Sequence, residues 1–356
     1  MERSHGGVSR VLEVDMLRFV AAISVVIFHY SFRGFAADGY TKFSIQSISP
    51  VTQYGYLGVN LFFIISGFVI LMTAQHGCLK RFVISRITRL YPAFWASCTL
   101  TAVVILVAND HRFSVNLFQW LVNMTMMSGF AGIRSIDGVY WSLFVELKFY
   151  LLVVALIHFN KLRFIENYLF GWLVVSMLLL VKPLPYLYAL FIPQHAPYFV
   201  SGAIFYLIYR DGWRRKYTLL LAASFFMSLY VSWRECEQLK EYFSGVVFNN
   251  HIVMSVVSLF FAVFVLVTQK ITQKVVRPWF VIFGALTYPL YLVHQNIGYV
   301  ILNKIPTEYY GGHVLLFLVV FMLLLAWMLH SEVERRYSKL LRIWLEKVLL
   351  KTGSPT

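Results

Sequence analysis

Long apolar segments recur along this chain and constrain its fold more than any other feature of the sequence. Most of them have about 15–22 residues, the length at which a helix crosses the hydrocarbon core of a bilayer. The composition agrees, because 59% of the 356 residues are hydrophobic, 13% are charged and the mean hydropathy is +0.69. We therefore predict an all-α fold, a polytopic transmembrane helical bundle of about ten transmembrane helices. The predicted spans are 12–31, 54–74, 91–108, 140–158, 168–181, 196–209, 217–232, 250–268, 282–302 and 313–330.

The distribution of lysine and arginine predicts how these spans are oriented. If the N-terminus is cytoplasmic, the loops on the same side hold most of the basic residues, including Lys80, Arg81 and those of the tail from Arg335 to Lys351. Cytoplasmic loops of membrane proteins are enriched in basic residues, so we expect both termini to be cytoplasmic. The net charge of +15 is then a topology signal first and a sign of anionic ligands second, and we expect no nucleic-acid partner.

Two predicted outer loops, 32–53 and 109–139, are long enough to contribute to a site. The second contains an amphipathic stretch at 113–130, which we interpret as a re-entrant or interfacial helix. The C-terminal tail, 335–356, is basic and amphipathic, and we expect it to lie on the cytoplasmic surface of the membrane.

Arg18 and His29 lie in the first apolar segment. Ionisable groups inside a membrane are costly and are usually retained for function. Eleven residues make three helical turns plus roughly 20°, so both side chains share one face about 16 Å apart. The alternative is that His29 is a packed, hydrogen-bonded helix contact. Asp15 is positioned one turn from Arg18 and is expected to pair with it.

Further polar side chains fall at a depth similar to that of His29 when the spans are aligned in the bilayer. They come from the second, fourth and ninth spans, and several polar groups at one depth favour a functional site over isolated packing contacts. The candidates are Asn60, Ser142, Glu146, Tyr288, Tyr291 and His294.

Arg86 and Arg89 stand three residues apart just before the third predicted span. Ordinary positive-inside residues would explain them. Two arginines one helical turn apart can also hold a phosphate through several charged hydrogen bonds. From spacing alone the two interpretations are equally good.

Five motifs in order resemble the acyltransferase-3 family of integral membrane O-acyltransferases, of the bacterial surface-glycan acetyltransferase type. They cover nearly the whole chain, and each alone would be weak. The motifs are VDMLRFVAAISVVIFHY, GYLGVNLFFIISGFVI, RITRLYP, VYWSLFVELKFYLL and LTYPLYLVHQ.

The resemblance implies a ten-helix enzyme that takes an acyl group from cytoplasmic acyl-CoA, with acetyl-CoA the default donor and no metal. The acceptor would be a hydroxyl of a surface glycan or lipid-linked sugar beyond the membrane, and the enzyme would be a multi-pass protein of the bacterial cytoplasmic (inner) membrane in contact with membrane lipid. It also implies an acyltransferase domain at 1–334, followed by the tail at 335–356.

The resemblance implies roles for the candidate residues as well. His29, Glu146 and His294 would be catalytic, with His29 as the general base. Arg18, Arg86 and Arg89 would bind the coenzyme. The remaining candidates, expected to bind substrate or donate to the oxyanion, are Asn60, Ser142, Tyr288 and Tyr291.

Three questions stay open from the sequence. The acyl group passes either directly to the sugar or first to His29. The donor is acetyl-CoA, or a succinyl or longer acyl-CoA. The alternative function is a proton-coupled transporter or flippase of a glycan precursor, although no inverted repeat supports it; a structural membrane partner without catalysis fits least well.

Overall fold

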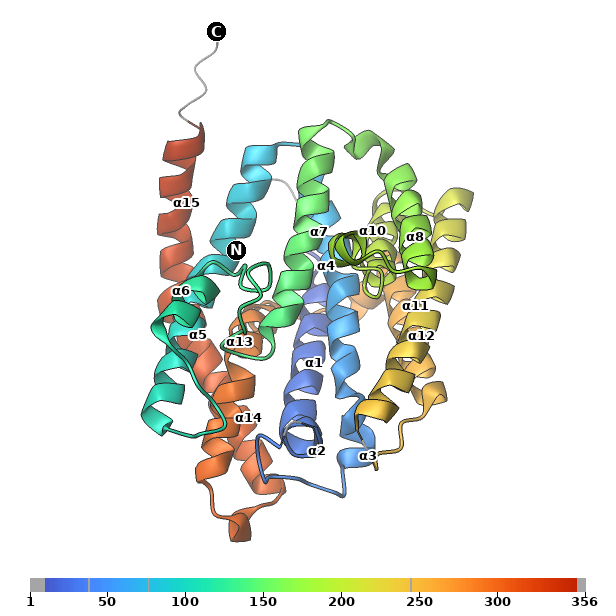
Figure 1. Ribbon diagram of the computed structural model, residues 1–356. Coiled ribbons are helices and arrows are strands. Elements are labelled where there is room, and N and C mark those ends of the chain that lie inside the picture. The colour runs from blue at the N-terminus through green and yellow to red at the C-terminus, as the bar shows by residue number, and fades with distance from the viewer. Residues whose placement is uncertain (1–9, 38, 76, 244, 351–356) are drawn as a thin grey trace. The chain divides into compact units, whose positions relative to one another are not determined.

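A computed structural model describes residues 10–37, 39–75, 77–243 and 245–350 of the chain. All regular secondary structure in these residues is helical (Figure 1), which confirms the predicted all-α class. The α-helices are α1 (Leu12–Phe28), α2 (Gly34–Ala36), α3 (Ser49–Thr52), α4 (Gly58–Ala74), α5 (Leu79–Ala108), α6 (Leu117–Met124), α7 (Tyr140–His158), α8 (Ile165–Val181), α9 (Pro185–Phe191), α10 (Ala196–Asp211), α11 (Arg215–Tyr242), α12 (Asn250–Thr268), α13 (Phe280–Lys304), α14 (Gly312–Met328) and α15 (Arg335–Leu350). Four 3₁₀ segments (Gln53–Leu57, Leu162–Phe164, Ile271–Val275 and Thr307–Tyr309) and two π-helical segments, η1 (His29–Arg33) and η6 (Leu329–Glu334), complete the set.

Six helical stretches in the described residues are long and apolar enough to cross a membrane. They support the expectation of a membrane protein, while the count of ten spans and the orientation of the termini stay predictions. The six are Ser49–Ala74, Leu79–Ala108, Tyr140–His158, Leu162–Val181, Asn250–Thr268 and Gly312–Leu350.

The structure corrects two of the predicted elements and adds a third. Helix α5 begins at Leu79, so Arg86 and Arg89 lie inside a helix and not in a loop before one. The amphipathic stretch at 113–130 forms only the eight-residue α6. This helix begins at Leu117 because the Asn116 side chain caps its N-terminus by accepting from the Gln119 N–H. The short helix α9 was not predicted.

The chain divides into two compact units. The first comprises residues up to Arg18, Val59–Leu79 and Val145–Val281. At its centre, α10 is buried along most of its length and packs against α8, α11 and α12. A Cβ atom at Gly67 of α4 would overlap the Phe199 carbonyl, and one at Gly202 of α10 would overlap the Ile64 carbonyl. Glycine at both positions therefore allows α4 and α10 to approach closely. Small residues have the same effect at the interfaces of other membrane helices.

The second unit comprises Phe19–Gly58, Lys80–Phe144 and the chain from Ile282 onward. Its buried centre is α13, which is enclosed from Leu290 to Val300. Gly298 of α13 leaves the space that the Tyr30 ring occupies, and the Tyr30 hydroxyl donates to the carbonyl of His294 over 2.5 Å. This contact fixes the start of η1 against α13, where two of the candidate site residues lie.

Candidate active site

His29 and His294 form a buried pair in the second unit. Nε2 of His294 lies 3.2 Å from Nδ1 of His29, and the ring centroids are 4.9 Å apart in an edge-to-face arrangement. His29 is the first residue of η1, where α1 changes to π-helical geometry. Such π-helical turns within α-helices occur frequently at functional sites.

The backbone around the pair determines which nitrogen atoms carry protons. Nδ1 of His29 is 2.8 Å from the Val25 carbonyl, and Nδ1 of His294 is 2.9 Å from the Tyr291 carbonyl. A carbonyl oxygen can only accept, so both Nδ1 atoms carry hydrogen when the rings are neutral. The His29 Nδ1–H then donates both to the Val25 carbonyl and to Nε2 of His294, and the lone pair of the His29 ring is on its Nε2. The pair therefore presents one basic nitrogen, Nε2 of His29.

Ser142 and Tyr291 lie beside this pair. The Ser142 Oγ and Tyr291 Oη atoms are 2.7 Å apart, and the Tyr291 ring centroid is 5.6 Å from that of His294. The structure thus brings together four of the residues that the sequence singled out: His29, Ser142, Tyr291 and His294.

Tyr288 lies elsewhere than we expected. Its hydroxyl donates to the Leu90 carbonyl over 3.0 Å, and its ring centroid is 5.8 Å from the guanidinium carbon of Arg89. It is therefore a neighbour of Arg89, and its expected role as a substrate-binding residue or oxyanion donor stays a prediction.

Three candidates belong to the first unit. The Glu146 carboxylate accepts from Ser66 Oγ and Tyr150 Oη, both at 2.7 Å. Asn60 Nδ2 donates to Tyr198 Oη over 3.3 Å. Arg18 lies 3.6 Å from Asp15, which confirms their predicted ion pair.

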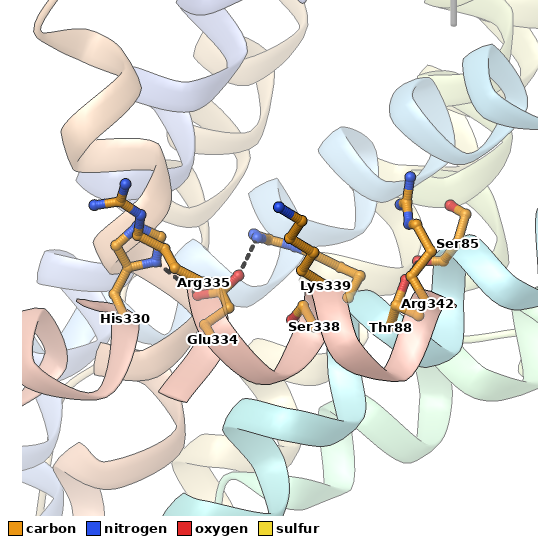
Figure 2. Close-up of a pocket in the computed structure, with 9 residues that line it drawn as sticks. Ser85, Thr88, His330, Glu334, Arg335, Ser338, Lys339 and Arg342 are labelled. Atoms are coloured by element: carbon orange, nitrogen blue, oxygen red, sulfur yellow. Dashed lines mark hydrogen bonds and ion pairs between the residues drawn. The ribbon is translucent and has the colours of Figure 1, made fainter. Parts of the chain in front are cut away.

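A basic cavity of about 420 Å³ lies in the second unit, between α5, η6 and α15 (Figure 2). Glu334 is buried there and pairs with both Arg89 and His330. Figure 2 shows Arg335, Lys339 and Arg342 projecting from α15, and the sequence spacing of four and three residues places them on one face. The lining residues are Ser85, Thr88, Arg89, His330, Glu334, Arg335, Ser338, Lys339 and Arg342.

This cavity has the chemistry of an anion site. Four cationic side chains and three hydroxyl groups line it, and such donors suit phosphate oxygens. The hydroxyl of Ser338 is buried and has no hydrogen-bond partner within the described residues, so it is available to a ligand.

The structure separates Arg86 from Arg89. Arg86 does not line the cavity but donates to the Ser85 hydroxyl, over 2.8 Å from Nη2. Arg86 and Arg89 therefore do not line this cavity together, as the binding of one phosphate by both would require. The tail contributes the other cations, and the sequence signal that could have revealed them was the spacing of basic residues that follows Glu334.

A model of the acyltransferase-3 family, described as an acyltransferase domain, matches residues 11–331. The chain belongs to this family and is an acyltransferase, as the motifs implied, and membership favours transfer chemistry over the transporter alternative.

Two curated proteins are similar to this chain. The putative acetyltransferase ORF330 of Acidianus two-tailed virus is 23% identical over 297 residues, which cover 79% of this chain and 81% of that protein. Nodulation protein 10 of Rhizobium leguminosarum bv. viciae is 28% identical over 165 residues, 40% of this chain and 43% of that protein. No solved structure matches the chain.

Proposed function

We propose that this acyltransferase moves an acyl group, acetyl by default, from acyl-CoA to a hydroxyl of a glycan or lipid-linked sugar on the opposite side of the membrane. The coenzyme is on the cytoplasmic side, and the membrane is the bacterial cytoplasmic membrane. The observation that carries the proposal is the histidine pair, because its hydrogen bonds leave Nε2 of His29 as a base.

The basic cavity is the proposed coenzyme site. A coenzyme A donor carries several phosphate groups, and Arg89, Arg335, Lys339 and Arg342 supply matching positive charge. The orphaned Ser338 hydroxyl supplies a further donor. A role of Arg18 in coenzyme binding rests on the sequence resemblance.

Helix α13 connects the cavity to the histidine pair within the second unit. Tyr288, which contacts Arg89, and His294, which contacts His29, are six residues apart on this helix, about 9 Å along its axis. An extended thioester arm is longer than this, so phosphates held at Arg89 are compatible with a carbonyl carbon presented to His29.

The chemistry follows from the assigned protons. Nε2 of His29 accepts the hydroxyl proton while the sugar oxygen attacks the thioester carbonyl. His294 Nε2 accepts from Nδ1–H and so stabilises the imidazolium that forms. When the tetrahedral intermediate collapses, the carbon–sulfur bond breaks, and the imidazolium returns the proton to the leaving thiolate. A route through acyl-His29 uses the same nitrogen as nucleophile.

The test compares surface glycans by mass spectrometry from a deletion strain complemented with the wild type, with His29→Ala or with His111→Ala. His111 is exposed and lies outside both sites, so its variant is the matched control. We expect acyl groups on the glycan with the wild type and the control and none with His29→Ala. Identical glycans in the wild-type and deletion strains would refute the proposal.

A further inference from the structure

A second polar cavity, of about 260 Å³, lies in the same unit as the histidine pair and takes no part in the chemistry described above. Its lining comes from η1, α5 and α13, and from the loops that follow α2, follow α5 and precede α7. The lining side chains that matter for its chemistry are Arg33, Tyr40, Phe113, Arg134, Gln295 and Asn296.

This cavity is next to the reactive histidines. Gln295 directly follows His294 on α13, and Arg33 ends the π-helical segment that His29 begins. The Tyr299 ring links the two places, since its centroid is 5.9 Å from that of Tyr40 and 6.4 Å from that of His29. A group bound in the cavity is therefore close to the proposed base.

Hydrogen bonds hold one wall of the cavity in place. The Asp137 carboxylate accepts from the backbone N–H of Asn296 over 3.0 Å and from that of Val139 over 3.1 Å. The Asn296 side chain donates to the Ile136 carbonyl over 2.7 Å. Gly138 has no side chain, and a Cβ there would overlap the Gln295 amide. The segment before α7 is thus preorganised against α13.

The lining combines positive charge with groups that suit a sugar. Arg134 donates to the Tyr40 hydroxyl over 2.9 Å, and the Tyr40 and Phe113 rings lie 5.2 Å apart. Guanidinium groups recognise carboxylate and phosphate oxygens, while amide and hydroxyl groups and aromatic faces suit sugar hydroxyls and ring faces. The volume is below the range of about 300–1,000 Å³ typical of sites for drug-sized ligands, so it suits a single sugar unit.

We propose that this cavity binds the acceptor and selects a sugar unit that carries a negative charge, either a carboxylate or a phosphate. Arg134, with Arg33, recognises the anionic group, and Gln295 positions the hydroxyl that faces His29. This inference rests on the proposed function and narrows its acceptor to one chemical class.

The test measures binding and so does not depend on turnover. The full-length protein in lipid nanodiscs is titrated with methyl β-D-glucuronide, glucose 6-phosphate and neutral methyl β-D-glucoside, and binding is followed by saturation-transfer NMR. The variants are Arg134→Gln, Arg134→Lys and the control Lys42→Gln, which removes an exposed charge two residues from Tyr40 that does not line the cavity. Arg134 is itself exposed, so its variants are expected to fold.

We expect the wild type and Lys42→Gln to bind at least one charged sugar roughly ten- to a hundred-fold more tightly than the neutral one. Arg134→Gln should remove this preference, and Arg134→Lys should keep part of it. Preference for the glucuronide indicates a carboxylate, and preference for the 6-phosphate indicates a phosphate. Equal binding of charged and neutral sugars by the wild type, or an unchanged preference in Arg134→Gln, would overturn the inference. A failure of the proposed function appears separately, as absent acetyl-CoA-dependent transfer in a protein that still binds the charged sugar.

Discussion

Nε2 of His294 accepts a hydrogen bond from Nδ1–H of His29 over 3.2 Å, although the two residues are 265 positions apart in the chain. Two backbone carbonyls, those of Val25 and Tyr291, orient both rings from the other side. The result is a single free basic nitrogen in a buried setting. The first prediction tests that nitrogen directly.

His29→Ala should reduce acyl transfer by about 10²–10⁴, because the proton acceptor is lost. The loss is larger if His29 also carries the acyl group. Coenzyme affinity should be unchanged, since the basic cavity keeps all its residues. Transfer is measured with radiolabelled acetyl-CoA and coenzyme binding by calorimetry, each per folded molecule. Normal turnover in the folded variant would remove His29 from the mechanism.

Arg89→Ala should weaken coenzyme binding by roughly ten- to a hundred-fold, the usual loss for a charged hydrogen bond to phosphate. Arg86→Ala should weaken coenzyme binding less, because the Arg86 guanidinium donates to the Ser85 hydroxyl and does not line the cavity. Titration of both variants with coenzyme A separates the two roles. Equal losses of coenzyme affinity in the two variants would indicate that both arginines bind one phosphate. No loss of affinity in either variant would mean that the positive-inside rule explains both arginines.

Asp137→Asn should change how stability depends on pH. Burial raises the pKa of the Asp137 carboxyl from 3.8 to about 7, although hydrogen bonds from Asn296 and Val139 act in the opposite direction. Between these values the folded chain binds more protons than the unfolded chain, so the contribution of this group to stability falls as pH rises from about 4 to 7. The melting temperature in detergent, measured from pH 5 to 8, should therefore decline more steeply in the wild type than in the variant. Parallel curves would contradict the raised pKa.

Gly202→Ala should destabilise the protein by about 1–3 kcal/mol, because the added methyl group meets the Ile64 carbonyl and α4 must shift from α10. Gly171→Ala in α8 is the matched control. A Cβ there meets nothing within 4 Å, and alanine favours a helix over glycine by up to about 1 kcal/mol. Denaturant titration of the two variants measures the difference. If Gly202→Ala were as stable as the control, the close approach of these helices would be wrong.

The topology proposal predicts the compartment of two positions. Reporter fusions after residue 160 and after residue 356 should both report the cytoplasm, because the loops on that side hold most of the basic residues. A fusion within the predicted outer loop at 109–139 serves as the control and should report the outside. An external signal at residue 356 would place the basic cavity on the wrong side for a cytoplasmic donor.

The sequence by itself determined the helical class and many helix limits. The predicted span 250–268 coincides with α12, and 140–158 with α7, because an apolar run of membrane length specifies a helix through its own residues. Ordered motifs also identified the family and the residues of the histidine pair. Local composition is less informative where a helix continues past its apolar part, so the start of α5 at Leu79 was missed.

Only the tertiary structure decided which of these residues meet. The ion pair between Arg89 and Glu334 joins positions 245 residues apart, and it turns the basic tail into part of a cavity. The same packing placed Tyr288 next to Arg89, and Arg134 next to Tyr40. A hydrophobic pattern indicates which face of each helix is buried, but it does not indicate which helix packs against that face. The neighbouring helix depends on the crossing angle and on which side chains fit between the two helices.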